Sequence, residues 1–311
     1  MWLSFLKRTC AEAAASGRLR AFATVELIVA LTLAAAVAPP VFAGLRNAAR
    51  LYRLCRDERV AERRAGTVAA VLKMPLRFCG LGMPSNPSEY KKAFGSKLAA
   101  PFSWDGAVSV EGGRLRVAYA FPEGSRSSEP CAGSVYDASP KLTRAPDSGS
   151  FDMGLWDKSS SVKNWVLFPD AYPESAPLTV TNVSGSTLRL RSRTEEKYEI
   201  PKGARLFLFR ALECWTDGEK FYTRDFRTTG GQPRADGVLG ARFELNEERN
   251  MLTLCLMVRG EDAGLAGTPV KNRGCPDDFL ALWPPGSHRY ALYAFRFVWR
   301  LPNAGLNAEA L

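Results

Sequence analysis

Residues 21–37, AFATVELIVALTLAAAV, are the stretch of sequence that decides how this chain is organised. Between Phe22 and Leu45 the only ionisable side chain is Glu26. Roughly 20 apolar residues, each adding about 1.5 Å of helix, cross the hydrocarbon core of a bilayer. Basic residues outnumber acidic ones in the preceding residues 1–21, and such an excess keeps its side of a membrane helix in the cytoplasm. We therefore expect one membrane-spanning helix, with the rest of the chain outside the cytoplasm.

Two ordinary roles for such a segment are a cleaved secretory signal and a plain signal anchor. The first would use Ala36-Val37-Ala38 as its cleavage motif. Pro39 argues against it, because a proline after the scissile bond has no N–H group and a fixed φ, and fits poorly in the extended conformation that a signal peptidase binds. A plain anchor leaves Glu26 unexplained, since an acidic residue inside a membrane helix costs free energy and is a functional candidate.

The residues around Glu26 resemble a known processing signal. Residues 20–26, RAFATVE, with the apolar run behind them, are similar to the class III signal of type IV prepilins and type II secretion pseudopilins; Ala21 stands where that family has glycine. The resemblance implies that a prepilin peptidase cuts between Ala21 and Phe22 and N-methylates Phe22. It also implies that Glu26 pairs with the N-terminal amine of a neighbouring subunit. A carboxylate and an ammonium are each costly alone in an apolar filament core and tolerable together.

The helix is expected to continue out of the membrane. Residues 45–74 lack proline and are rich in alanine, leucine and arginine, which favour helix, while Met74-Pro75 predicts the helix end. Pro39 and Pro40 interrupt the hydrogen-bond ladder, which predicts either a kink or the end of the membrane span.

A basic stripe is expected on the first part of this stalk. Arg46, Arg50 and Arg53 follow one another at helical spacing. The stalk packs on the protein's own domain or on neighbouring subunits, and anionic lipid headgroups are a second partner for the stripe.

From Ala107 onward the sequence has the pattern of strands. Two hairpins stand out, residues 108–121 around a turn at 111–113 and residues 243–258 around a turn at 246–250. Further strand candidates are Trp165 to Phe168, Leu178 to Val183, Thr187 to Ser192, Arg205 to Leu212, Lys220 to Phe226 and Tyr290 to Arg300.

We therefore expect an α+β chain in three parts. They are a basic leader peptide at residues 1–21, a transmembrane and stalk helix at residues 22–73, and a β-rich antiparallel globular domain at residues 74–311. Residues 124–161, rich in serine, proline, glycine and aspartate, predict a long surface excursion. Residues 76–84, LRFCGLGMP, and the hairpin near the C-terminus resemble minor pilins of the PilW type and J-type pseudopilins.

The cysteine count favours an oxidising compartment. The chain has seven cysteines and no C-x-x-C pair. Cleavage before Phe22 would remove Cys10 and leave an even set able to form up to three disulfides: Cys55, Cys79, Cys131, Cys214, Cys255 and Cys275. Sequence does not choose among the pairings, and Cys255 with Cys275 is no more than a guess. The alternative is buried free thiols acting as small apolar residues.

Signs of catalysis or of cofactor binding are weak. His288 is the only histidine and is expected at a strand edge or in solvent. Ser88 with Lys91, and Ser160 with Lys163, match S-x-x-K and are expected in loops. The acidic pairs at 247–248 and 277–278 have no metal-loop spacing. The net charge of +10 is spread along the chain without an aromatic-interleaved patch, so we expect no nucleic-acid partner, no metal, no cofactor and no enzymatic activity.

The function expected from the sequence is structural. The chain resembles a minor pilin or pseudopilin subunit that a prepilin peptidase processes at the inner membrane and that joins other subunits in a type IV pilus or a type II secretion pseudopilus. The alternative is a single-pass inner-membrane protein whose β-rich periplasmic domain binds or senses a ligand.

Overall fold

A computed structural model of the chain describes residues 19–84, 86–94, 98–133, 137–152, 161–171, 177–192, 198–263, 269–284 and 286–304. The chain divides into two compact units, Met1–Arg56 and Asp57–Leu311. One long helix, α2, runs from Leu19 to Arg77 and so contributes to both. A β-rich antiparallel region follows it, which confirms the expected α+β class.

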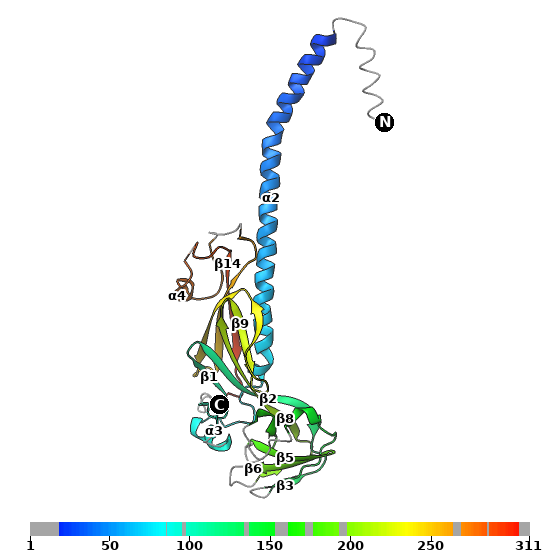
Figure 1. Ribbon diagram of the computed structural model, residues 1–311, viewed down its shortest axis with the longest axis vertical. Helices are drawn as coiled ribbons and strands as arrows, with labels where there is room; N and C mark the ends of the chain where they lie inside the picture. The colour runs from blue at the N-terminus through cyan, green and yellow to red at the C-terminus, as the bar shows by residue number, and fades with distance from the viewer. Residues whose placement is uncertain are drawn as a thin grey trace. The chain divides into compact units, whose positions relative to one another are not determined.

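Helix α2 is continuous through Pro39 and Pro40, and Figure 1 shows it curved in its dark blue N-terminal part. The predicted end at Met74-Pro75 is wrong, because the helix continues to Arg77. Pro75 removes one backbone donor, but Leu76 in the next position is 1% exposed. Tertiary packing of that last turn outweighs the lost hydrogen bond.

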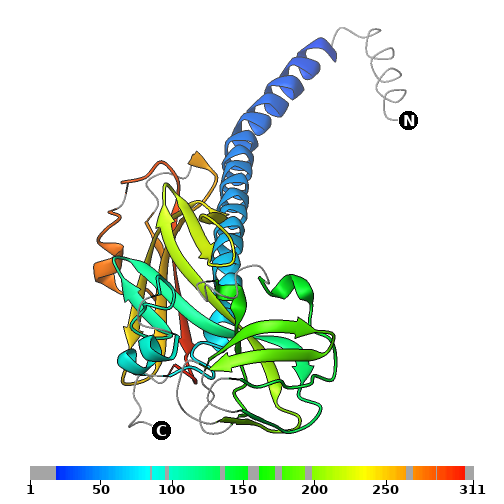
Figure 2. The same cartoon turned by 60° about the horizontal axis from the view of Figure 1, so that its bottom comes forward.

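The C-terminal part of α2 is built into the second unit. Apart from Pro75, its buried side chains recur every third or fourth residue, as expected for one face of a helix: Asp57, Ala61, Ala65, Val68, Leu72 and Leu76. Figures 1 and 2 both show this lighter blue part of the helix beside the strands. The second unit therefore begins inside the helix, at Asp57, rather than after it.

The larger sheet is organised around one long strand, β8. Its order is β1-β2-β8-β4-β5-β6, with β9 also paired to β8 and β10 paired to β9. Both edges of β8 are paired, with β2 on one side and β4 and β9 on the other, so its residues form a nearly continuous buried run. The strands are β1 Val108–Glu111, β2 Arg114–Arg126, β4 Trp165–Leu167, β5 Leu178–Ser184, β6 Thr187–Ser192, β8 Arg205–Asp217, β9 Lys220–Asp225 and β10 Gln232–Asp236.

The second sheet has the order β11-β12-β14-β13, antiparallel except for the parallel pair β13–β14. Its strands are β11 Val238–Asn246, β12 Met251–Arg259, β13 Lys271–Arg273 and β14 Leu292–Arg300, and a separate short pair joins β3 Cys131–Gly133 to β7 Tyr198–Ile200. The two expected hairpins are confirmed as β1–β2 and β11–β12.

Short helices complete the unit: α3 Pro87–Phe94, α4 Asp277–Leu280, and the 3-10 turns Ser148–Ser150 and Val162–Asn164. Helix α3 packs through Phe94, whose ring lies 5.1 Å from Trp165 and 4.8 Å from Phe209, centroid to centroid. Ser88 and Lys91, expected in a loop, lie in this helix instead, whereas Ser160 falls outside the described residues.

Residues 124–161, expected as a surface excursion, are mostly exposed where the structure describes them, but the segment also packs on the larger sheet through a few buried apolar residues. Ala138, Leu142 and Phe151 are at most 5% exposed and pack with Leu188 and Leu190 of β6. The segment is polar overall, so its sequence did not indicate that these few apolar residues pack on the larger sheet.

Candidate functional site

The apolar part of α2 is the first candidate site. The helix from Thr24 onward is long and apolar enough to cross a membrane, and no side chain between Thr24 and Arg56 is buried. The backbone of Ala21 and Phe22 is helical, and their side chains lie outside the described part of the structure.

Glu26 is exposed on this helix. Within the described residues it takes part in no hydrogen bond or ion pair with another side chain. A carboxylate on an otherwise apolar helix surface gains most from a cation supplied by another molecule, because both charges are then removed from the apolar phase as a pair. Arg46, Arg50 and Arg53 are also exposed further along α2.

A second cluster lies where α2 joins the β-rich unit, centred on the buried carboxylate of Asp57. Asp57 is 2% exposed. Its Oδ1 accepts hydrogen bonds from the backbone N–H groups of Glu261, at 2.5 Å, and Asp262, at 3.0 Å, and its Oδ2 accepts one from the Tyr293 hydroxyl, at 3.3 Å. These donors compensate the cost of burying the charge and fix the helix against the loop after β12.

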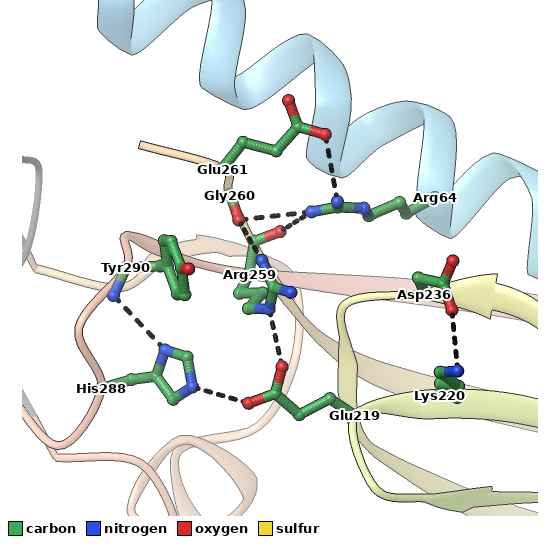
Figure 3. A network of polar contacts seen from close by, with 9 residues as sticks. All are labelled: Arg64, Glu219, Lys220, Asp236, Arg259, Gly260, Glu261, His288 and Tyr290. Atoms are coloured by element: carbon green, nitrogen blue, oxygen red, sulfur yellow. Dashed lines mark hydrogen bonds and ion pairs between the residues drawn. The ribbon is translucent and has the colours of Figure 1, made fainter. Parts of the chain in front are cut away.

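Gly260 makes this approach possible. A Cβ atom at residue 260 would lie 1.7 Å from Oδ2 of Asp57, so only glycine fits there. Arg64, two helical turns further along α2, donates from Nη1 to the carbonyl oxygens of Arg259, at 2.7 Å, and Gly260, at 3.3 Å. Its Nη2 pairs with Glu261 at 3.2 Å, as Figure 3 shows. One short loop is thus held by an acid and a base of the same helix.

A third contact joins α2 to β13. Glu58 pairs with Lys271 at 2.6 Å and with Arg273 at 2.6 Å, and Arg273 also pairs with Glu62 at 2.6 Å. The hydrogen bond from Lys271, assisted by Arg273, holds the pKa of Glu58 below its ordinary value. A carboxylate whose pKa is lowered on folding contributes stability above its unfolded-state pKa and loses it as the pH falls through the folded-state pKa.

Replacing Glu58 by glutamine is expected to destabilise the protein by about 1–2 kcal/mol at neutral pH, because Lys271 and Arg273 lose their shared carboxylate. The difference between wild type and variant should shrink as the pH falls through the folded-state pKa of Glu58, which lies below its ordinary value, because only below that pKa is Glu58 protonated in both states of the wild type. Urea unfolding of the full chain in detergent, followed by tryptophan fluorescence at several pH values, measures this. Glu247→Gln, in the exposed β11–β12 turn, is the control; a Glu58 difference independent of pH would contradict the role of the ion pairs.

The loop after β12, at residues 259–262, also contacts the larger sheet, through Glu219 in the β8–β9 turn. Arg259 Nε donates to Glu219 Oε2 at 2.8 Å, and His288 Nε2 lies 3.3 Å from Glu219 Oε1 (Figure 3). Arg259 and then His288 lower the pKa of Glu219. The backbone N–H of Tyr290 donates to Nδ1 of His288, at 3.3 Å, so the proton that His288 shares with Glu219 sits on Nε2.

His288 is therefore part of a structural network. Its side chain is 19% exposed, less than expected for a solvated histidine. Among the described residues, its hydrogen bonds are to a carboxylate and a backbone N–H group, and none joins it to a serine or cysteine nucleophile. No group of three or more potential metal ligands occurs in the described part of the chain.

A cavity of about 350 Å³ lies between β1 and residues 100–105. Arg116 is the basic residue among the described residues that line it, beside Asp105 and Glu111, and it is already paired with Glu111 and, at 3.2 Å, with Glu213. Lys91 outside the cavity is paired with Asp105 at 2.6 Å. The charges at this cavity neutralise one another, so they favour no particular ligand.

The candidate cysteines are thiols in very different surroundings. Cys79 and Cys214 are fully buried, Cys131 is half-buried and Cys55 is exposed. Cys79 donates to the carbonyl oxygen of Ala107 at 3.4 Å. Cys255 and Cys275 belong to the same buried cluster.

Sequence reasoning located Glu26 but missed the cluster around Asp57. The residues that meet there are about 200 positions apart, as in the pair Asp57 and Glu261, and no short motif joins them. The sequence held one sign of this cluster: Asp57 lies on the same helix face as Ala61 and Ala65, so an acidic residue interrupts an apolar face of the stalk.

No protein-family model matches the chain, and no curated protein and no solved structure matches it significantly.

Proposed function

We propose that this chain is a minor pilin or pseudopilin subunit. A prepilin peptidase removes residues 1–21 at the inner membrane, Phe22 becomes the N-methylated first residue, and the subunit joins other pilin or pseudopilin subunits in a type IV pilus or a type II secretion pseudopilus. The role of the chain is assembly rather than catalysis.

The observation that carries the proposal is Glu26. It is the only ionisable residue between Phe22 and Leu45, on a helix of which no side chain from Thr24 to Arg56 is buried. A membrane helix without a carboxylate would be less costly to insert, so this residue needs a function that offsets its cost. Pairing with the Phe22 amine of a neighbour supplies one, because cleavage before Phe22 creates a new ammonium group close to the carboxylate.

The attachment of α2 to the β-rich unit supports the same role. Within two helical turns, Asp57 and Arg64 tie the helix to the loop after β12, and Glu58 ties it to β13. Such contacts suit a subunit that assembles through its helix, because they fix the globular domain on the last turns of the helix instead of leaving it on a flexible linker.

Processing by a prepilin peptidase is the first test. Co-expression of the full chain with an active prepilin peptidase should shorten it by residues 1–21, whereas a catalytically inactive peptidase should leave it intact. Ala21→Gly should be cleaved faster than the wild type, because glycine stands before the cut in the family that this signal resembles and has no Cβ to hinder close approach of the peptidase. If the chain stays at full length with both peptidases, even as Ala21→Gly, the single-pass membrane protein with a ligand-binding or sensing domain becomes the better account.

A further inference from the structure

The segment from residue 269 to 284 covers the outer face of the second sheet. Its strand β13 pairs with β14, and Phe279 of α4 is 1% exposed. Trp283 lies so close to β11 that a Cβ at Gly240 would come within 2.5 Å of its ring. Arg242 of β11 pairs with Asp278 at 2.6 Å. We name residues 269–284 the cover segment.

Two cysteines meet under the cover segment. Cys255, on β12, and Cys275, two residues after β13, are 1% and 4% exposed and belong to one small cluster with Met257, Phe279 and Ala294. The β-sheet register explains the approach independently. Cys255 lies directly opposite Arg296 of β14. Gly274 lies against the same arginine: a Cβ atom at residue 274 would be 3.8 Å from Cβ of Arg296.

The loop that carries Cys275 is tightly held. The backbone N–H of Cys275 donates to Asn272 Oδ1 at 2.8 Å, and Asn272 Nδ2 donates to the carbonyl oxygen of Cys275 at 2.9 Å. Gly274 adopts φ +91°, a left-handed conformation that lets the chain turn Cys275 under the cover segment. Each thiol contributes to the shift in the pKa of the other, in keeping with their shared cluster.

We propose that Cys255 and Cys275 form an intramolecular disulfide when the chain is exposed to a disulfide oxidant. The thiolate of one cysteine attacks the oxidant disulfide and forms a mixed disulfide, releasing one oxidant thiol. The second cysteine then displaces the other oxidant thiol. Two electrons and two protons pass from the cysteines to the oxidant, which ends as two thiols. The inference does not depend on filament assembly, since it needs only an oxidant of this chemical class.

The order of folding and oxidation follows from burial. Burial raises the pKa of Cys275 to about 12 and also raises that of Cys255, so few thiolates exist once the cover segment has closed. The thiolate is the attacking species, so the bond forms while the segment is open. Once formed, it fixes the segment that holds Lys271 and Arg273, the partners of Glu58.

Peptide mapping of the full chain tests the proposal. The protein, purified in detergent in reduced form, is incubated with oxidised glutathione in mild urea, quenched with an alkylating agent under denaturing conditions and digested. We expect one dominant cross-linked peptide that joins Cys255 to Cys275 and lacks two hydrogen atoms, with the other cysteines alkylated. The reaction should be several-fold slower without urea. Dominant pairing of either cysteine with another residue, or alkylation of both after oxidation, would overturn the proposal.

A stability measurement separates the disulfide from incidental oxidation. Oxidation should raise the thermal midpoint of the wild type by several degrees, because the bond closes a loop of about 20 residues. Cys255→Ala should lose this shift and Cys55→Ser, at an exposed position, should keep it. An equal shift in Cys255→Ala would contradict the assignment.

Discussion

Replacing Glu26 by alanine should leave membrane insertion intact and reduce incorporation into filaments about a hundredfold or more. Without the carboxylate, the Phe22 amine of a neighbouring subunit would remain unpaired in an apolar environment. An uncompensated buried charge costs about 3–5 kcal/mol, which corresponds to at least a hundredfold in an assembly equilibrium. The measurement is the ratio of the chain in sheared filaments to the chain in the membrane, by immunoblot, in cells that express the assembly machinery.

Two further variants make this test specific. Glu26→Gln keeps the size of the side chain and removes the charge, so it should fail like the alanine variant. Glu26→Asp keeps the charge with a shorter reach and should retain part of the incorporation. Normal incorporation of Glu26→Gln would contradict the ion pair, and equal loss in Glu26→Asp and Glu26→Ala would indicate that shape rather than charge is required.

The second large effect is expected at Gly260. Gly260→Ala should destabilise the protein by about 3 kcal/mol or more, because the new Cβ would lie 1.7 Å from Oδ2 and 2.2 Å from Cγ of Asp57. Asp57 has little room to retreat, since its Oδ1 is held by the N–H groups of Glu261 and Asp262. Urea unfolding in detergent, followed by tryptophan fluorescence, gives the free energy of unfolding.

The same substitution in the same fold provides the control. Gly66 lies in α2 with nothing within 4 Å of the position of a Cβ, so Gly66→Ala should stabilise the helix by about 0.5–1 kcal/mol. Asp57→Ala combined with Gly260→Ala should cost less than the sum of the two single changes, since removing the carboxylate removes the clash. An effect of Gly260→Ala below about 0.5 kcal/mol, or strict additivity, would contradict the close packing of helix and loop.

The sequence predicts the helices and strands that have strong local patterns. The apolar run after Phe22 and the alternating residues of β11 and β12 indicate a helix and a hairpin by themselves. Helix α3 was missed although its start is visible: the Ser88 N–H donates to Asn86 Oδ1 at 2.9 Å, and Pro87 is the first helical residue. Strands β3, β7 and β13 have three residues each, too few for a period to emerge.

The contacts that fix the helix to the sheets could not be predicted from the sequence. Asp57 and Arg64 are typical polar residues of a stalk, and only the fold places them against the loop at residues 259–262. In contrast, Glu26 is conspicuous in the sequence because its neighbours are uniformly apolar. The guess that Cys255 lies near Cys275 gained support only from the register of β12 with β14 and the pairing of β13.

The N-terminal residue of the chain recovered from filaments tests the central claim most directly. Cells that express the complete assembly machinery are sheared, and the N-terminal peptide of the chain in the filament fraction is identified by mass spectrometry. The proposed function predicts that this peptide begins with N-methylated Phe22 and retains Glu26 as its fifth residue. A chain found only in the inner membrane, with residues 1–21 still attached, would contradict it.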